Sequence, residues 1–287
     1  MSMLPQSQAA LAGSPPVTRP FAVVTGGSEG IGLAIARELV GRGYNLLLIA
    51  RHAERLDAAA ASLRAGTATE IATLALDLTR PDTPAIIDAR LEGLDGHVDL
   101  LVNNAGIGHC GAFADIRPDD LEALLALNVA VPLRLMRHVL PGMRARRRGG
   151  ILNVASLGGF VPGPWQATYY ASKAMLLSAS EAVAAEVRGY GIRVTVVAPG
   201  PVATAFHARM GAARAYYLRL LPAASPQSVA RWAVWGYELG LRVVAPGFLT
   251  VLGAVACRHL PHALLVPFMA TLLHPRLPPE EGAARNA

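Results

Sequence analysis

The sequence predicts an α/β fold: one doubly wound parallel sheet of the Rossmann type, in a single domain that ends in an apolar helical extension. From residue 21 onward, short apolar runs alternate with longer segments of helical pattern. The apolar runs are nearly continuous, which is typical of parallel strands buried on both faces. Repeated β-α-β units imply right-handed crossovers and helices on both sides of an open sheet.

Six apolar runs are expected to contain strands, and two segments between them the first helices. The strand segments are 21–27, 45–51, 71–78, 98–106, 149–156 and 192–200. The helical segments are 31–43 and 52–65. The first glycine-rich turn therefore lies at the head of a β-α-β unit, where such sheets bind nucleotides.

Three parts are expected along the chain: a flexible tail over 1–19, a nucleotide-binding catalytic domain over 20–240, and an apolar extension over 241–287. The tail lacks the basic start and the long apolar run of a signal peptide. Residues 243–257 carry no charge, but this stretch is shorter than the ~20 residues that span a bilayer. Three roles stay open for 243–275: a cap over a substrate pocket, an oligomer contact, or an anchor on a membrane surface.

Composition excludes several classes of protein. Apolar residues make up 53% of the chain and charged residues 16%, which is not the composition of a disordered protein. The net charge of +6 comes from scattered arginines, and the one dense basic run, 144–148, precedes two glycines as a helix C-terminus would. We expect no nucleic-acid partner.

Cysteine and histidine usage predicts neither a disulfide framework nor a metal. Cys110 and Cys257 lie far apart and outside any CxxC pattern, and the eight histidines show no HExxH spacing. This cysteine usage suits a reducing compartment, so we expect a cytoplasmic location.

The turn TGGSEGIG follows the first strand directly and opens a helix. Gly26 allows a tight turn, and Gly30 with Gly32 lets backbone amides at the helix N-terminus approach a pyrophosphate. The second strand ends about 20 residues later at Arg51. An arginine there suits the 2′-phosphate of NADP(H), whereas an acidic residue would suit the ribose of NAD.

Lys173 is the one lysine of the chain, and it lies four residues after Tyr169 in the segment TYYASKAM. On a helix these two residues share a face. A nearby ammonium lowers the pKa of a tyrosine, and it can hydrogen-bond a ribose hydroxyl that a planar guanidinium would fit badly. Tyr170 is three residues from the same lysine, so helical geometry leaves it open as an alternative to Tyr169.

These residues, together with an upstream serine, resemble the short-chain dehydrogenase/reductase family. The similar motifs follow in order through most of the chain: TGGSEGIG (25–32), DL (77–78), NNAG (103–106), Asn128, Ser156, YYASK (169–173) and PGPVAT (199–204). Two segments, 46–63 and 103–116, further resemble the branch of DltE-type proteins and of 3-ketoacyl and hydroxysteroid reductases.

The resemblance implies a catalytic set. Tyr169 would be the general acid in carbonyl reduction and the base in the reverse reaction. Ser156 would hydrogen-bond the substrate oxygen, and Lys173 would lower the tyrosine pKa and hold the ribose. Asn128 would keep a proton-relay water in place by kinking its helix.

The cofactor that the resemblance implies is NADP(H), with Asp77 beside the adenine and Asn104 on the adenosine side. The full expected set is Gly26, Ser28, Gly30, Ile31, Gly32, Arg51, Asp77, Leu78, Asn104, Ala105, Gly106, Tyr169, Lys173, Pro199, Gly200, Val202 and Thr204.

The expected function is the NADP(H)-dependent interconversion of a carbonyl and a secondary alcohol on an apolar substrate of ketoacyl, lipid or steroid-like type. Segment 205–230, rich in apolar and aromatic residues, is expected to form a mobile lid over that substrate. The alternative is a cofactor-binding regulatory or scaffold protein with the same fold. The intact catalytic set favours the enzyme, and the resemblance also implies a homo-oligomer.

Overall fold

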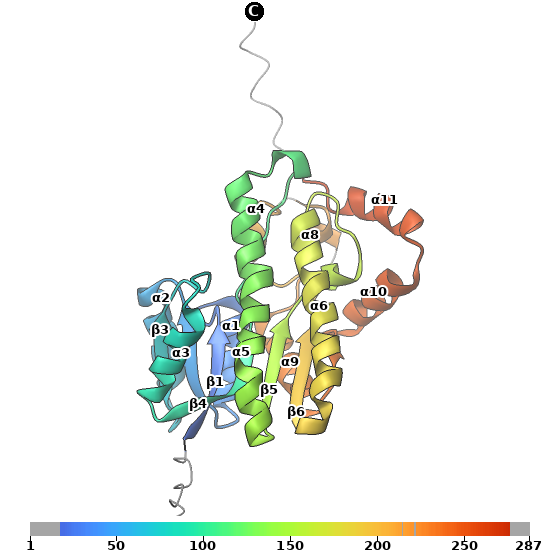
Figure 1. The fold of residues 1–287 in the computed structure, drawn as a ribbon. Coiled ribbons are helices and arrows are strands. Elements are labelled where there is room, and N and C mark those ends of the chain that lie inside the picture. The colour runs from blue at the N-terminus through green and yellow to red at the C-terminus, as the bar shows by residue number, and fades with distance from the viewer. Residues whose placement is uncertain (1–17, 214, 221, 276–287) are drawn as a thin grey trace, which may run out of the picture.

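In the computed structural model, seven parallel strands form one sheet in the order β3-β2-β1-β4-β5-β6-β7 (Figure 1). The structure describes residues 18–275 except 214 and 221, so nearly all of the tail expected at 1–19 lies outside it. The strands are β1 (Arg19–Thr25), β2 (Asn45–Ala50), β3 (Ile71–Ala75), β4 (Gly96–Asn103), β5 (Gly149–Val154), β6 (Ile192–Val197) and β7 (Val243–Val244). The strand order reverses between β1 and β4, which confirms the doubly wound sheet and creates a crevice there.

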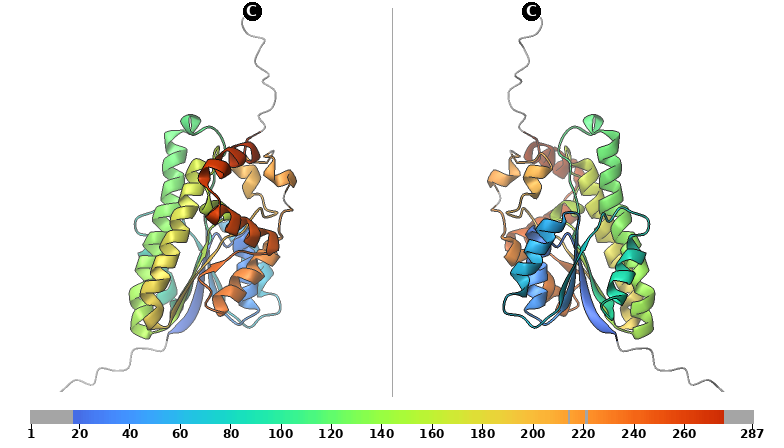
Figure 2. Two further views of the ribbon diagram at one scale, coloured as in Figure 1. Left: turned by 90° about the vertical axis from the view of Figure 1, so that its right-hand side faces the viewer. Right: turned by 90° about the vertical axis from the view of Figure 1, so that its left-hand side faces the viewer.

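Helices cover both faces of the sheet (Figures 1 and 2). Helices α1, α2 and α9 pack on one face, and α3, α5 and α6 on the other. The helices are α1 (Gly30–Val40), α2 (Ala53–Arg64), α3 (Thr83–Glu92), α4 (Pro118–Leu125), α5 (Val131–Arg146), α6 (Ala167–Val187), α7 (Phe206–Arg209), α8 (Tyr217–Leu220), α9 (Pro226–Glu238), α10 (Phe248–His259) and α11 (His262–Leu272). The last two lie beyond the sheet, at its carboxyl end, and form the helical extension (Figure 2).

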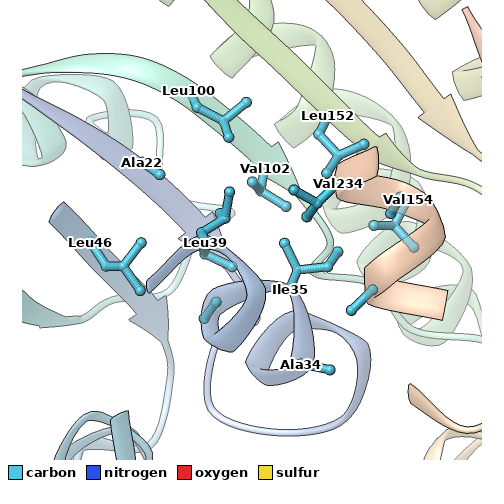
Figure 3. Close-up of a cluster of buried hydrophobic side chains, with 14 of the residues drawn as sticks. Ala22, Ala34, Ile35, Leu39, Leu46, Leu100, Val102, Leu152, Val154 and Val234 are labelled. Atoms are coloured by element: carbon cyan, nitrogen blue, oxygen red, sulfur yellow. The ribbon is translucent and has the colours of Figure 1, made fainter. Parts of the chain in front are cut away.

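The central residues of the strands are mostly apolar because both faces of the sheet are buried. In β2, Leu46 and Leu48 belong to the cluster under α1 and α9, whereas Leu47 and Ile49 belong to the cluster under α3 and α5. Figure 3 shows the first cluster, where Ile35 of α1 points among side chains of the sheet and of α9. A one-sided sheet would have alternated apolar and polar residues instead.

The structure adds one strand to the six expected. β7 has only two residues and pairs with the end of β6, so it lacks the length of apolar run that reveals a strand in a sequence. The basic run 144–148 lies at the C-terminal end of α5, as predicted. There Arg144 stacks on the Tyr190 ring at 4.3 Å and Arg148 pairs with Asp99.

Among the described residues, one continuous helical stretch, Pro118–Arg146, is long and apolar enough to cross a membrane by length and composition. Several of its apolar side chains, including Leu135, Met136 and Met143, belong to the core cluster under the sheet, whereas Leu125 and Leu133 are exposed. One face of this stretch therefore packs as a core helix does.

Candidate active site

The glycine turn between β1 and α1 requires its glycines. Gly26 and Gly30 have φ values of +64° and +57°, in the left-handed region that favours glycine. A Cβ atom on Gly32 would lie 2.2 Å from the backbone oxygen of Gly26. The turn therefore folds back on the first turn of α1, and its backbone amides gather at the N-terminus of that helix, which suits a phosphate.

Asn104 fastens this turn to the end of β4. Its side-chain amide donates to the backbone oxygens of Thr25 and Gly26 at 3.0 and 3.1 Å. The Thr25 hydroxyl in turn accepts from the backbone amides of Asn104 and Ala105. These residues hold the crevice between β1 and β4 in one shape, so Asn104 acts here through the backbone of the turn.

A cavity of about 740 Å³ runs from the glycine turn, past the ends of β4, β5 and β6, to α10 and α11. It brings together most of the residues that the sequence assigned to the cofactor. Those that line it are Gly26, Ser28, Gly30, Ile31, Asn104, Ala105, Gly106, Tyr169, Lys173, Pro199, Gly200, Val202 and Thr204. Gly32 lies beneath the turn, outside the cavity wall.

Ser156, Tyr169 and Lys173 meet on one wall of the cavity. Ser156 follows β5, and its Oγ accepts a hydrogen bond from the Gly158 amide at 3.1 Å. Tyr169 and Lys173 lie on the first turns of α6, and the Lys173 Nζ is 5.7 Å from the centre of the Tyr169 ring. Lys173 Nζ donates to the backbone oxygen of Val154 at 2.9 Å, which anchors it beside the same strand end.

Burial has the largest effect on the pKa values of Tyr169 and Lys173. It raises the pKa of Tyr169 to about 12, and a hydrogen bond with Ser156 acts in the opposite direction. Burial also lowers the pKa of Lys173 to about 8. The sequence led us to expect that the ammonium lowers the tyrosine pKa. In the protein alone the direction is the reverse, because both groups are withdrawn from water.

The hydrogen bond with Ser156 distinguishes Tyr169 from Tyr170. Tyr170 also lines the cavity, but its ring packs over Gly158 and Gly163, where added Cβ atoms would meet it at 2.9 and 2.3 Å. Burial holds the pKa of Tyr170 well above its usual range. Of the two tyrosines, Tyr169 is the one in contact with a polar group that could share a substrate oxygen.

Asn128 lies behind the wall in a π-helical turn, Ala126–Ala130, that joins α4 to α5. Its side chain exchanges two hydrogen bonds with the backbone of Ile107, at 2.9 and 2.7 Å, and donates to the Ser172 hydroxyl. A Cβ atom on Gly106 would lie 3.2 Å from Asn128 Oδ1 and 3.6 Å from Lys173 Nζ. The irregular helix thus brings a polar group to the rear of the wall that holds Ser156, Tyr169 and Lys173.

The residues expected near the adenine lie outside the cavity wall, at the ends of β2 and β3. Two hydrogen bonds from Thr79 lower the pKa of Asp77, and the positive charge of Arg51 adds a smaller effect. Arg51 is exposed and forms no ion pair among the described residues. Leu78 is buried in the core. An arginine without a carboxylate partner at this position is free to meet a phosphate.

Other side chains of the cavity escaped the sequence analysis. Gln166, just before α6, and His207 and Tyr217, on α7 and α8, line it, but no spacing pattern links them. The lid expected over 205–230 is also too long. Its final residues, from Pro226, begin α9, whose Val229 is wholly buried in the core. Among the described residues no group of three or more histidine, cysteine or acidic side chains is arranged to hold a metal.

Comparison with known proteins supports this architecture. The family model described as short chain dehydrogenase matches residues 20–215. A short-chain dehydrogenase from Sphingobium yanoikuyae, solved in complex with NADPH, is similar with a TM-score of 0.74 at 29% identity, over 93% of this chain and 100% of that one.

Curated relatives match over part of their length. A very-long-chain 3-oxoacyl-CoA reductase of Pyrenophora tritici-repentis is 37% identical over 191 residues, which cover 64% of this chain and 55% of the relative. A 17-beta-hydroxysteroid dehydrogenase type 3 of Danio rerio is 39% identical over 190 residues, 64% of this chain and 61% of the relative. The matched region thus spans little more than half the length of these relatives. The chain belongs to the short chain dehydrogenase family, and it resembles the ketoacyl and hydroxysteroid reductases within it.

Proposed function

We propose that this protein is an NADP(H)-dependent oxidoreductase that interconverts a carbonyl and a secondary alcohol on an apolar substrate. One observation carries the proposal: Ser156, Tyr169 and Lys173 share a single cavity with the glycine turn of β1 and α1. The cofactor-binding and proton-transferring groups thus face the same space. The names of the curated relatives and the NADPH-bound neighbour support the same reaction class.

Tyr169 acts as the general acid in the reducing direction. With its pKa raised to about 12 by burial, the side chain is a neutral phenol at pH 7 and can donate its proton to a developing alkoxide. Ser156 donates a hydrogen bond to the same oxygen and stabilises its charge as it forms. NADPH supplies the hydride when bound. In the oxidising direction Tyr169 must first lose its proton, so we expect that direction to need higher pH.

Lys173 orients the ribose of the cofactor and presents its positive charge to the catalytic wall. Asn128 and the backbone of Ile107 lie behind it, so a proton that leaves Tyr169 has a polar route away from the cavity. That route is the relay expected for Asn128. The glycine turn cradles the pyrophosphate, and Asp77 lies beside the adenine with the backbone of Leu78, whose side chain is buried.

Arg51 selects NADPH over NADH. It lies at the end of β2, exposed and without an ion-pair partner among the described residues. A guanidinium binds a 2′-phosphate by paired charged hydrogen bonds. The NADPH complex of a structural relative is consistent with this choice.

The substrate is apolar, because the half of the cavity away from the glycine turn is walled mainly by aliphatic and aromatic side chains. They include Val161, Phe206, Met210, Leu265, Met269 and Leu273. The relatives named as very-long-chain 3-oxoacyl-CoA and 17-beta-hydroxysteroid enzymes suggest acyl-chain or steroid-like ketones. A scaffold protein would not need one cavity that holds both a cofactor site and an apolar substrate site.

The test is NADPH oxidation, with NADH alongside, over ketones that run from short and polar to long-chain 3-oxoacyl and steroid. We expect turnover that prefers NADPH and rises with the apolar area of the ketone. NADPH binding without turnover of any ketone would favour the scaffold alternative.

We further propose that 243–275 rests on an anionic membrane surface while the rest of the protein stays in the cytoplasm. The exposed face of α10 and α11 is apolar, with Phe248 80%, Leu264 67% and Phe268 60% exposed. The segment contains no Asp or Glu but carries Arg258, so its charge complements anionic lipid. Both Leu264 and Phe268 also line the cavity, so a second copy of the chain seated on this face would cover its mouth. The homo-oligomer implied by the family would then use another face, and light scattering would show whether that oligomer forms.

A further inference from the structure

Polar side chains gather at one place in the otherwise apolar half of the cavity. Gln166, His207 and Tyr217 line it there, away from the glycine turn. Gln166 is 3% exposed and Tyr217 8%, so both are buried. Burying polar groups in an apolar wall costs free energy unless they are hydrogen-bonded, so a cluster at this point calls for a reason.

The three side chains form one hydrogen-bonded chain. The Tyr217 hydroxyl is 2.9 Å from Nδ1 of His207, and it also hydrogen-bonds the side chain of Gln166. The chain joins α7 and α8 to the residue that precedes α6, three positions before Tyr169. An arc of ring contacts runs beside it: Tyr169 to Phe206 at 5.4 Å, Phe206 to His207 at 5.8 Å and His207 to Tyr217 at 5.7 Å. The cluster is therefore in contact with the wall that holds the catalytic tyrosine.

The direction of these hydrogen bonds follows from the protonation of the groups. Burial raises the pKa of Tyr217 and lowers that of His207, so both are neutral near pH 7. The hydrogen bond from Gln166 opposes the rise in the pKa of Tyr217, as a bond donated by the Gln166 amide to the phenol oxygen would; the same amide nitrogen also lies 3.9 Å from the Cys110 Sγ. The hydroxyl of Tyr217 then donates to Nδ1 of His207, and the neutral imidazole carries its proton on Nε2.

Nε2 of His207 is the open end of this chain. Among the described residues it has no hydrogen-bond partner, and it is not among the buried polar atoms left unsatisfied there. His207 itself lines the cavity. Its N–H is therefore available to a group inside the cavity, and that group must be an acceptor.

We propose that His207, oriented by Tyr217 and Gln166, binds a second and uncharged oxygen of the substrate, a carbonyl or hydroxyl other than the ketone that is reduced. The inference rests on the proposed function and narrows its substrate class to apolar ketones that carry a second neutral oxygen. A carboxylate is disfavoured, because the donor is neutral and its surroundings are apolar. The proposal covers both a steroid-like diketone and a 3-oxoacyl thioester, since each presents a second acceptor oxygen.

The test compares matched ligand pairs that differ in the second oxygen. One pair is a steroid dione and the corresponding steroid monoketone; the other is a 3-oxoacyl thioester and a 3-alkanone of equal chain length. For the pair that fits, we expect the wild type to favour the oxygenated member in kcat/KM by roughly tenfold or more. His207→Leu should bring this ratio close to one, and His207→Gln, which keeps an N–H donor, should restore part of it. The pair that responds identifies the kind of substrate.

Two further variants separate this role from a purely structural one. Tyr217→Phe keeps the ring but removes the hydroxyl that orients His207, so it should lower the ratio by an intermediate amount. His109→Leu alters a histidine that does not line the cavity and should keep the wild-type ratio. Equal losses on both members of a pair in His207→Leu would mean that the residue only holds the lid, and would overturn the proposal.

Affinity measurements keep this outcome distinct from failure of the proposed function. Calorimetry on the protein loaded with NADP⁺, which has no hydride to give to the ketone, yields the same ratio from dissociation constants. Selective binding without turnover would contradict the enzyme and support the subsite. If the wild type reduced the ketones but showed a ratio near one for both pairs, the result would support the enzyme and contradict the subsite at His207.

Discussion

The two ends of the cavity are built in different ways. At the nucleotide end, the turn after β1 is held by hydrogen bonds from Asn104 and by a backbone contact at Gly32 that leaves no room for a methyl group. At the substrate end, α10 and α11 leave large apolar side chains exposed, both outside the cavity, as Phe248 at 80% and Leu252 at 56%, and on its wall, as Leu264 at 67%. Directional hydrogen bonds shape the end where amides must meet a charged phosphate, whereas outside the His207 cluster non-directional apolar contact suffices for a hydrocarbon.

The largest effect is expected at Tyr169, on the wall between the two ends of the cavity. Tyr169→Phe should lower kcat by about 10²–10⁴-fold, because it removes the proton donor and leaves the ring in place. NADPH binding, followed by fluorescence titration, should stay within about threefold of wild type. Tyr170→Phe is the matched control and should cost far less. Equal losses in the two variants would refute the assignment of Tyr169.

The nucleotide end should not tolerate even one methyl group. Gly32→Ala places a Cβ 2.2 Å from a backbone oxygen, so the turn must move. We expect NADPH affinity to fall by more than about tenfold and the free energy of unfolding to drop by about 1–3 kcal/mol. Gly189→Ala is the control, because a Cβ there meets nothing within 4 Å. Calorimetry measures the affinity and urea denaturation the stability. Wild-type values of both in Gly32→Ala would show that the turn can adapt to a methyl group.

Cofactor choice should depend on one exposed side chain. Arg51→Gln removes the proposed partner of the 2′-phosphate, so KM for NADPH should rise by roughly tenfold while KM for NADH changes little. Arg55→Gln, an exposed arginine on α2, serves as the control. A parallel rise for both cofactors would point to a role in folding rather than in selectivity.

At the substrate end, polar substitutions on the exposed face of α10 should weaken membrane binding without blocking the cavity. Phe248→Ser combined with Leu252→Ser should reduce sedimentation with phosphatidylglycerol vesicles by about tenfold or more, because exposed apolar area is lost. Turnover of a short soluble ketone should persist. Leu239→Ser alters a leucine that is 58% exposed but lies at the end of α9, outside this face. If that control lost vesicle binding equally, the proposed membrane face would be wrong.

The last prediction concerns stability and pH. The pKa of Lys173 is about 8 in the folded chain against an ordinary value of 10.5, so between these values the unfolded chain binds more protons and the free energy of unfolding rises with pH. The full effect is about 3 kcal/mol. Lys173→Met should lose turnover yet be more stable than wild type near pH 7, with the difference shrinking toward pH 10. Urea denaturation at both pH values measures this, and a constant difference would contradict the buried ammonium.

Much of the site could be predicted because its signals are local in the chain. The turn at Gly26, Gly30 and Gly32 and the pair Tyr169 and Lys173 each lie within eight residues, so spacing alone relates them. The choice between Tyr169 and Tyr170 is different. Both fit the helix, and only the loop after β5 brings Ser156 to one of them.

Local pattern also says nothing about the degree of burial. The sequence suggested an ammonium that lowers a tyrosine pKa, but withdrawal of both groups from water raises that of Tyr169 to about 12 and lowers that of Lys173 to about 8. Solvation depends on every segment that covers the cavity, including α10 and α11, so neighbouring residues alone cannot set it.

The sequence by itself determined the fold class, the apolar strands and the order of the family motifs, because periodicity and short-range spacing are properties of the chain. Tertiary structure alone decided that Gln166, His207 and Tyr217 meet, since they come from three separate segments. It also decided that the apolar extension both lines the cavity and remains exposed. Contacts between distant segments arise only when the sheet and its covering helices close around the same space.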